Sequence, residues 1–564
     1  MSRLVRRALL GSAAALVLTL VWVGVRGALA VSAVMDAAPA IADVATTLSD
    51  GPTPQVLESV DDVRAAVDRA RAHVGDPVWT AAQHLPVIGE RLESIRAAVT
   101  AADILSDDAL GPVVALSQFV SFGPFDEDGE GFTSLVEAGE LDDDLTHIAD
   151  AVLRAHAELD GISTDLFVPI ASDPFAEAVA HMEDAADVAS VLSPAVQAML
   201  VLNGYGRDTA TLVVFLDDRS ARPLGGTVER IMEVHATNGR VTSVEAVDAT
   251  AVMAAANASE AMTTAAAGAQ APLLTDRPSD VAQLATTADA AAALRAGVAA
   301  ALGRDAGAVV FLTSTGVDAL AQAQPQAVAE EPDAPAAPGL TAALTAAAPE
   351  ARAELIDAAA ASSVVDVLGL TARADLLALA VRDAVVGGGL RLWFAASDVQ
   401  APLAASRGGG GLPATTSQGT PVTVTADSGG SPSTPTVGTV SQASGTCGAP
   451  WSKRPESEVR VELVPSAPGT DPAPAVAPRI LVGMPRDARV SGITDARGST
   501  LASRVLDLDS QRVLLVETAQ PGAGPAGVTE LRVRVAGRAG QAPRLDVVVR
   551  GGAPAPDQGT FSCS

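Results

Sequence analysis

The chain has 564 residues, and its 67 Asp and Glu against 37 Lys and Arg give a formal net charge of −30. This charge excludes a nucleic-acid backbone or an anionic lipid surface as the main partner, because both are bound through basic residues. The sole lysine, Lys453, follows no glycine-rich phosphate loop, which excludes a P-loop nucleotide site. The length is enough for several domains, and with 3% aromatic residues their cores must be built from Ala, Val and Leu.

The N-terminus predicts a membrane anchor. Residues 1–7 contain three arginines, and the uncharged apolar run from Ala8 to Val25 is close to the shortest helix that spans a bilayer. Basic residues before such a run place 1–7 in the cytoplasm and the bulk of the chain outside it. A cleaved signal peptide is the alternative, because Ala28-Leu29-Ala30 resembles a cleavage site. We favour an uncleaved single-pass transmembrane helix at 8–30, since the run exceeds the usual signal core.

Residues 31–202 are expected to form a helical extracytoplasmic region. Apolar side chains recur there at the spacing of one helix face, in two separate segments. The first segment contains Val60, Val63 and Val67, and the second contains Leu141, Leu145, Ile148, Val152 and Leu159.

Residues 203–407 predict a mixed α/β domain. The apolar run 211–216 is typical of a buried strand, and 228–236 and 240–247 flank Asn238-Gly239, the preferred two-residue turn of a β-hairpin. The runs 308–312 and 390–394 predict further strands, separated by Ala-rich helices.

The C-terminal part predicts a flexible linker and then a β-rich domain. Residues 408–450 are rich in Gly, Ser, Thr and Pro, a composition that is typical of linkers. Residues 451–564 contain short runs with strict period-two alternation, which indicates half-buried strands of a β-sandwich. The expected fold class is therefore an α+β multidomain protein.

The cysteine content is consistent with export. Cys447 and Cys563 are the two cysteines of the chain, and an even number in an extracytoplasmic protein indicates a disulfide. Two unpaired thiols are the alternative.

Several motifs resemble a bacterial membrane-anchored family, known as domain of unknown function 4012. They are Pro77-x-Trp79 followed by 85–89, then the stretch 211–238 with its Arg-x-x-Gly-Gly turn, then 308–321 and 390–406. The resemblance implies an exported, envelope-associated protein. This chain departs from the family pattern at three positions, because the family has two Asn and a Glu where this chain has Asp217, Asp218 and Ser220.

The strongest candidate site is a polar cluster that directly follows the predicted strand 211–216. Strand ends are where α/β folds place ligand sites, and two carboxylates with an arginine could hold a divalent cation and a phosphate. This arrangement distantly resembles the LytR–CpsA–Psr envelope glycopolymer ligases, although no catalytic residue carries across. A charged surface loop is the alternative. The cluster contains Asp217, Asp218, Arg219, Arg222, Gly225 and Gly226.

A second motif, in residues 126–137, resembles a calcium-binding EF-hand loop. Acidic residues occupy positions 1, 3, 5 and 12 of the loop, namely Asp126, Asp128, Glu130 and Glu137. Glu at position 5 and Thr at position 8 depart from the pattern, so we expect an ordinary loop and no bound cofactor.

These features predict a scaffold, without catalytic activity, that acts in assembly of the cell envelope. Its expected partners are the membrane, through the N-terminal helix, and an envelope glycan or protein, with no nucleic acid. The alternative function is a phosphotransferase-like enzyme that acts on lipid-linked envelope glycans.

Overall fold

The computed structural model divides the chain into two compact units, Met1–Ser193 and Pro194–Ser564. Both contain helices, and the second contains three β-sheets, so the protein is an α+β multidomain protein. The described residues are 26, 54–84, 89–112, 140–159, 182, 186, 197–198, 201–202, 204, 209–218, 222–237, 240–274, 280–321, 339–347, 351–352, 354–356, 358, 380–381, 383–404, 406–411, 420–427, 436–447, 454–464, 479–486, 488–508, 511–517, 529–536, 545–550 and 557–560.

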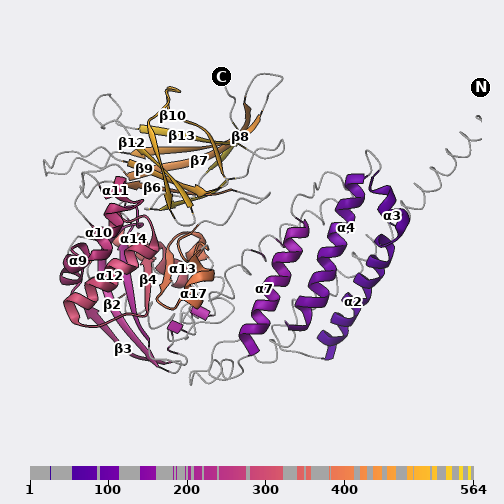
Figure 1. Cartoon of the computed structure of the whole chain (residues 1–564), viewed down its shortest axis with the longest axis horizontal. Helices are drawn as coiled ribbons and strands as arrows, with labels where there is room; N and C mark the ends of the chain where they lie inside the picture. The colour runs from indigo at the N-terminus through magenta and orange to yellow at the C-terminus, as the bar shows by residue number, and fades with distance from the viewer. Residues whose placement is uncertain are drawn as a thin grey trace, which may run out of the picture. The chain divides into compact units, whose positions relative to one another are not determined.

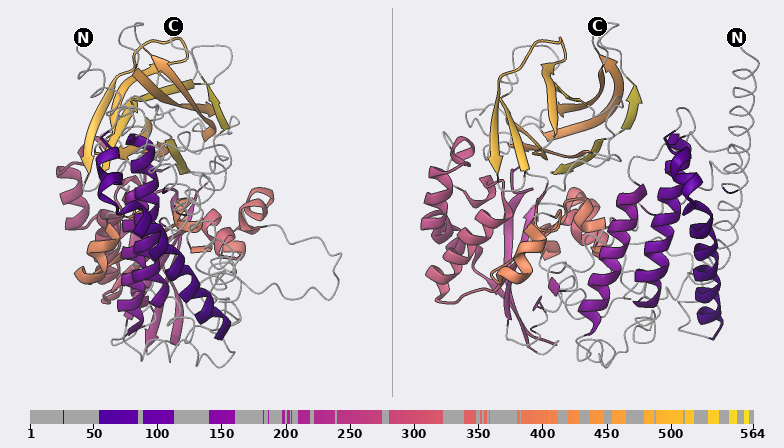
Figure 2. Two further views of the ribbon diagram at one scale, coloured as in Figure 1. Left: turned by 90° about the vertical axis from the view of Figure 1, so that its right-hand side faces the viewer. Right: turned by 45° about the vertical axis from the view of Figure 1, so that its right-hand side comes forward.

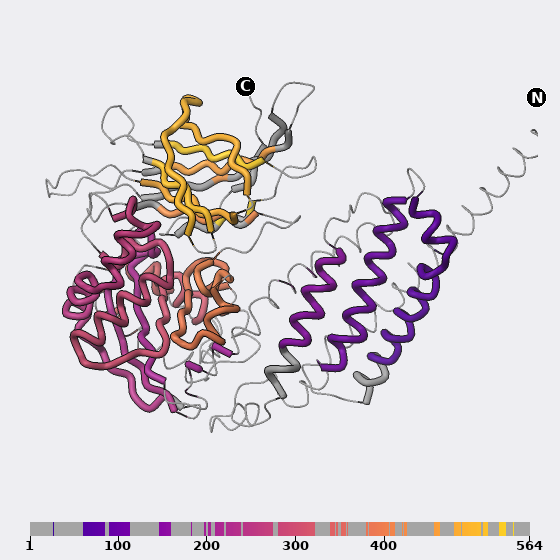
Figure 3. The backbone as a smooth tube through the Cα atoms, in the orientation of Figure 1, coloured from indigo at the N-terminus to yellow at the C-terminus, as the bar shows by residue number. Residues whose placement is uncertain are grey.

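The first unit contains a group of long helices, as the apolar spacing predicts. Helix α4 lies between α2 and α7 (Figures 1 and 3), and a single π-helical turn, η2, continues α4. The predicted apolar face of α2 is buried, and among residues 146–159 of α7 the buried ones are Leu159 and three alanines. The elements are α2 (Pro54–Val74), α3 (Pro77–Ala82), α4 (Gly89–Ile104), η2 (Leu105–Ala109) and α7 (Glu140–Leu159).

The predicted anchor and the calcium-like loop fall outside the described residues, apart from Arg26. Arg26 is helical, and its guanidinium donates to the Ala72 carbonyl at the end of α2 and lies 3.8 Å from the carboxylate of Asp76. Within the described ranges, every helix is too short or too polar to cross a bilayer. Residues 126–137 are not among those described.

The α/β domain is built on a five-stranded sheet in the order β3-β2-β1-β4-β5, in which β1 and β4 are parallel and the other pairs are antiparallel. The predicted strands and the hairpin are confirmed, while the turn residues 238–239 lie outside the description. The strands are β1 (Thr209–Asp217), β2 (Thr227–Thr237), β3 (Arg240–Val247), β4 (Ala308–Thr313) and β5 (Leu390–Phe394).

Alanine-rich helices cover one face of this sheet, as Figure 2 shows. Small side chains let these helices approach closely: a Cβ on Gly297 of α12 would lie 2.5 Å from the Val252 carbonyl oxygen of α9. Close packing of Ala and Gly therefore contributes to the core of a chain in which 3% of the residues are aromatic. The helices of the domain are α9 (Ala249–Asn257), α10 (Glu260–Ala267), α11 (Ala271–Leu274), η4 (Val281–Gln283), α12 (Thr287–Leu302), α13 (Ser314–Ala321), α14 (Leu340–Ala346) and α17 (Ser397–Ala404).

The C-terminal domain consists of two five-stranded sheets whose apolar faces form one core. Their strand orders are β10-β13-β8-β7-β15 and β11-β12-β9-β6-β14. The strands are β6 (Thr420–Asp427), β7 (Thr436–Cys447), β8 (Arg454–Val464), β9 (Arg479–Pro485), β10 (Arg489–Asp495), β11 (Ser503–Leu508), β12 (Gln511–Glu517), β13 (Thr529–Ala536), β14 (Leu545–Arg550) and β15 (Asp557–Thr560).

The structure differs from the predicted linker at 408–450. Strands β6 and β7 lie inside this range and belong to the two sheets of the sandwich. Val422 and Val424 of β6 are buried in the shared core, with Thr423 between them. Threonine is common in strands as well as in linkers, so the Thr- and Gly-rich composition of 408–450 did not indicate these two strands.

The buried carboxylate of Glu458, on the outer face of a sandwich sheet, makes the stability of the C-terminal domain depend on pH. Glu458 of β8 is 1% exposed and accepts hydrogen bonds from Arg460 (2.7 Å) and Arg534 (2.9 Å). Burial raises the pKa of Glu458, but the two arginines outweigh it and hold the pKa below its ordinary value of 4.5. The stabilisation is therefore present above pH 4.5 and is lost as the pH falls through the folded-state pKa.

We expect Glu458→Gln to remove part of this pH dependence. Melting temperatures measured between about pH 6 and about pH 3 should fall less steeply for the variant than for the unaltered protein. Parallel curves for the two proteins would contradict the role of this carboxylate.

Candidate functional site

The predicted polar cluster follows β1, at the carboxyl end of the two parallel strands. The turn 222–226 leads from this end into β2, and Thr227 pairs with Asp217. Parallel strands commonly carry ligand sites at this edge, so the position agrees with the sequence-based expectation. Arg219 lies outside the described residues, and Asp217 is half-buried.

The carboxylate of Asp218 caps a helix of the same domain. It is 4% exposed, and it accepts hydrogen bonds from Ser314 Oγ (2.7 Å) and from the hydroxyl (3.2 Å) and backbone N–H (3.4 Å) of Thr315. Ser314 and Thr315 begin α13, directly after β4. A helix N-terminus attracts negative charge, so Asp218 occupies the position where a parallel α/β fold could bind a phosphate.

A second cap extends this network from α13 to α14. The carboxylate of Asp318 accepts the backbone N–H groups of Leu340 and Thr341, the first residues of α14. The Thr341 hydroxyl in turn donates to Ser314 Oγ, 3.2 Å away. The acidic groups at this edge therefore connect β1, α13 and α14.

The Arg-x-x-Gly-Gly turn is shaped by close backbone contacts. Gly225 has φ of 102° and Gly226 has φ of 157°, and a Cβ on Gly226 would lie 2.5 Å from the Asp217 carbonyl oxygen. Only glycine fits such a position without moving the backbone. Arg222 is buried, with 7% exposure, and its carbonyl accepts the Gly225 N–H at 2.8 Å. The turn is thus packed against the end of β1.

Arg391 contacts the turn of this cluster, although the sequence analysis does not select it. It lies on β5, is 1% exposed, and its guanidinium donates to the Leu224 carbonyl in the turn. The guanidinium also lies 5.8 Å from the ring centre of Phe311 on β4. An arginine inside the apolar run 390–394 is the sequence signal that could have identified it.

Two of the described residues of the cluster, Asp218 and Arg222, are buried and so do not lie in a charged surface loop. The Asp218 carboxylate is also not open to a ligand, because its two oxygens accept three hydrogen bonds from α13. Among the residues that the structure describes, no group of three or more His, Cys, Asp and Glu could hold a metal ion.

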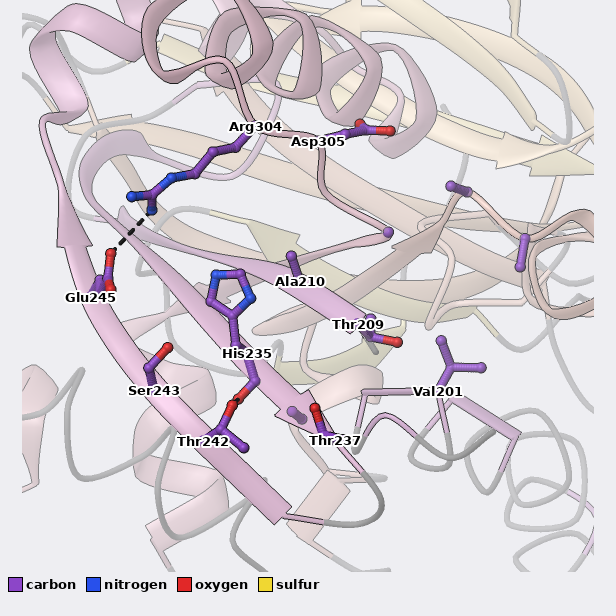
Figure 4. A pocket seen from close by; sticks show the side chains of 14 residues that line it. Val201, Thr209, Ala210, His235, Thr237, Thr242, Ser243, Glu245, Arg304 and Asp305 are labelled. Atoms are coloured by element: carbon purple, nitrogen blue, oxygen red, sulfur yellow. Dashed lines mark hydrogen bonds and ion pairs between the residues drawn. The ribbon is translucent and has the colours of Figure 1, made fainter. Parts of the chain in front are cut away.

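A cavity of about 850 Å³ lies at the opposite edge of the sheet, where β1 and β4 begin (Figure 4). It adjoins His235, Arg304 and a buried glutamate, Glu233, none of which the sequence analysis selects. The available signal is Glu233 itself, a charged residue between the apolar Met232 and Val234 of β2.

Comparisons of this chain with protein-family models, with curated proteins and with solved structures find no match. The family resemblance therefore stays a prediction that rests on the sequence motifs.

Proposed function

We propose that this protein is a membrane-anchored, extracytoplasmic scaffold with a structural role in assembly of the cell envelope. The basic residues before the apolar run 8–25 and the pair of cysteines support the location. Membership in the domain of unknown function 4012 family is part of the proposal.

One observation supports the non-catalytic role. In the cluster that is most similar to a phosphate site, the carboxylate of Asp218 accepts hydrogen bonds from the start of α13 and so stabilises the fold. A phosphotransferase acting on a lipid pyrophosphate needs carboxylates that face a cation and an arginine that faces phosphate. Here Asp218 binds the first residues of α13, and Arg222 is buried in the turn. The polar groups hold strand ends and helices together, which a scaffold requires.

The location is tested by fusing reporters to the C-terminus in a bacterial host. We expect an alkaline phosphatase fusion to be active, because that enzyme forms its disulfides only outside the cytoplasm, and we expect the protein to fractionate with membranes. An inactive phosphatase fusion combined with a fluorescent cytoplasmic reporter would contradict the proposed topology.

The role is tested by binding and turnover of a polyprenyl-pyrophosphate-linked disaccharide with the full-length protein in detergent. The scaffold proposal expects neither transfer of the glycan nor an affinity that depends on Arg222. Glycan transfer that Arg222→Lys abolishes, in a variant with an unchanged melting temperature, would establish the alternative enzyme instead.

A further inference from the structure

Arg26 contacts the junction between α2 and α3 in the helical unit. Its guanidinium donates to the Ala72 carbonyl at 3.2 Å, and the same nitrogen, Nη1, lies 3.0 Å from His73 Nδ1. The other terminal nitrogen, Nη2, lies 3.8 Å from Oδ2 of Asp76. Oδ1 of the same carboxylate caps α3, because it accepts the Val78 N–H at 2.7 Å. Residue 26 is therefore held against the last turn of α2 and the start of α3.

The sequence places Arg26 at the outer end of the predicted anchor. It is the first charged residue after the uncharged run 8–25, and that run of 18 residues extends about 27 Å as a helix, close to the thickness of the hydrocarbon core. The guanidinium of an arginine at such a position stays among the lipid headgroups. The contacts of Arg26 therefore bring the junction of α2 and α3 to the extracytoplasmic surface of the membrane. This step rests on the membrane anchor of the proposed function.

Residues 72–81, here called the α2–α3 corner, present an uncharged surface. Val78 is 37% exposed and is among the large apolar side chains that the described part of the chain leaves open to solvent. Apart from Ala65, the exposed residues of α2 between 61 and 71 are all charged. An uncharged surface enters the headgroup region without losing the hydration of a charge. The exposed residues of the corner are Ala72, Gly75, Pro77, Val78, Thr80 and Ala81.

We propose that the α2–α3 corner rests on the extracytoplasmic face of the lipid bilayer, with Pro77 and Val78 in the headgroup region. Arg26 and Asp76 form the contact that joins the corner to the anchor. The occupant is a neutral lipid surface, because the corner carries no exposed basic side chain that would attract anionic lipid. The inference deepens the proposed function by naming the part of the extracytoplasmic region that contacts the membrane.

The test uses full-length protein in phosphatidylcholine vesicles, with the photo-cross-linking residue p-benzoylphenylalanine in place of Val78. Intact-mass spectrometry after illumination measures the fraction of protein that carries a lipid adduct. Leu153→p-benzoylphenylalanine is the matched control, because Leu153 is 39% exposed and also lies on a helix of the first unit. We expect at least about 5-fold more adduct from position 78, since an interfacial contact reaches only about 5–10 Å into the lipid.

The control position lies well away from the corner. A Cβ on Gly89, the first residue of α4, would clash with the Gln83 carbonyl oxygen, so α4 begins beside the end of α3. At the other end, Asp108 of η2 pairs with Arg154, the neighbour of Leu153, at 2.8 Å. The helical residues 89–109 between these two contacts extend about 30 Å.

Arg26→Ala tests the contact that joins the corner to the anchor. We expect this variant to remain in the membrane fraction, because the apolar run is unchanged, and to give several-fold less adduct from position 78. Arg69→Ala is its control: Arg69 is an exposed arginine of α2, and its loss should leave the adduct yield unchanged.

Equal adduct from positions 78 and 153 overturns the proposal, as does an Arg26→Ala variant with an unaltered yield. Fractionation of the same samples separates this failure from that of the anchor. A protein that stays with the membrane but gives no adduct from position 78 overturns only the present inference. A protein that does not fractionate with membranes overturns the proposed anchor as well.

Discussion

Replacing Asp218 with alanine is expected to destabilise the α/β domain by about 2 to 4 kcal/mol. The substitution removes a buried charged acceptor from three donors at the start of α13, of which the Ser314 hydroxyl is buried and the two Thr315 groups are exposed. Equilibrium denaturation of the Asp218→Ala variant and the unaltered protein measures the difference. Asp218→Asn, which keeps one acceptor oxygen, should lose less.

Asp248→Ala provides the matched control for this prediction. Asp248 also caps a helix, α9, through the N–H groups of Thr250 and Ala251, but it is exposed. Its loss should cost about 1 kcal/mol, because water replaces the lost acceptor. If Asp218→Ala proved neutral or stabilising, Asp218 would resemble a ligand-binding residue, since functional sites commonly reduce stability. That result would overturn the observation on which the scaffold role rests.

Loss of the predicted Cys447–Cys563 disulfide is expected to lower the stability of the C-terminal domain by about 4 kcal/mol. Cys447 ends β7, and Cys563 lies outside the described residues. The structure nevertheless supplies one supporting observation. Strand β15 pairs with β7 in parallel, from Asp557 with Ser441 to Thr560 with Ser444, and each pair is 116 positions apart. Cys447 and Cys563 are separated by the same 116 positions.

Peptide mass spectrometry without reducing agent measures this prediction directly. Protein recovered from an oxidising compartment should yield a linked peptide pair, and reducing agent should lower its melting temperature. The Cys447→Ser/Cys563→Ser double variant, as the control, should melt at the lower temperature whether or not reductant is present. Alkylation of both thiols in the denatured, unreduced protein would contradict the disulfide.

The strands that the sequence analysis identifies are those whose burial follows a simple pattern. β1 and β4 are buried on both faces and are continuous apolar runs, whereas β8 and β13 alternate between buried valines and charged side chains. Strand β6 alternates equally well, but threonine occupies its polar positions, and the flanking Gly and Ser suggested a linker instead. Strands β10, β11 and β15 were not expected either: β10 has one buried residue, Ile493, four of the six residues of β11 are exposed, and β15 is four residues long.

The sandwich has a second apolar contact that no pattern in its own strands explains. Leu481, Val513 and Leu515 face away from the shared core and form a cluster with Leu273 of α11. Arg479 also donates to the Pro272 carbonyl, at 3.1 Å. Because both faces of β9 are covered, that strand is a continuous apolar run, unlike the alternating β8.

The sequence by itself was sufficient to predict the α+β class, the helical first region, the hairpin and the end of β1 as the place where polar groups gather. These features depend on periodicity and turn chemistry between residues that are close along the chain. Only the tertiary structure decided what the polar groups do. The hydrogen bonds from Ser314 to Asp218, from Arg391 to Leu224 and from Arg304 to Glu233 join residues between 71 and 167 positions apart. Whether a carboxylate faces solvent, a ligand or a helix N-terminus depends on such distant neighbours, and local pattern carries no information about them.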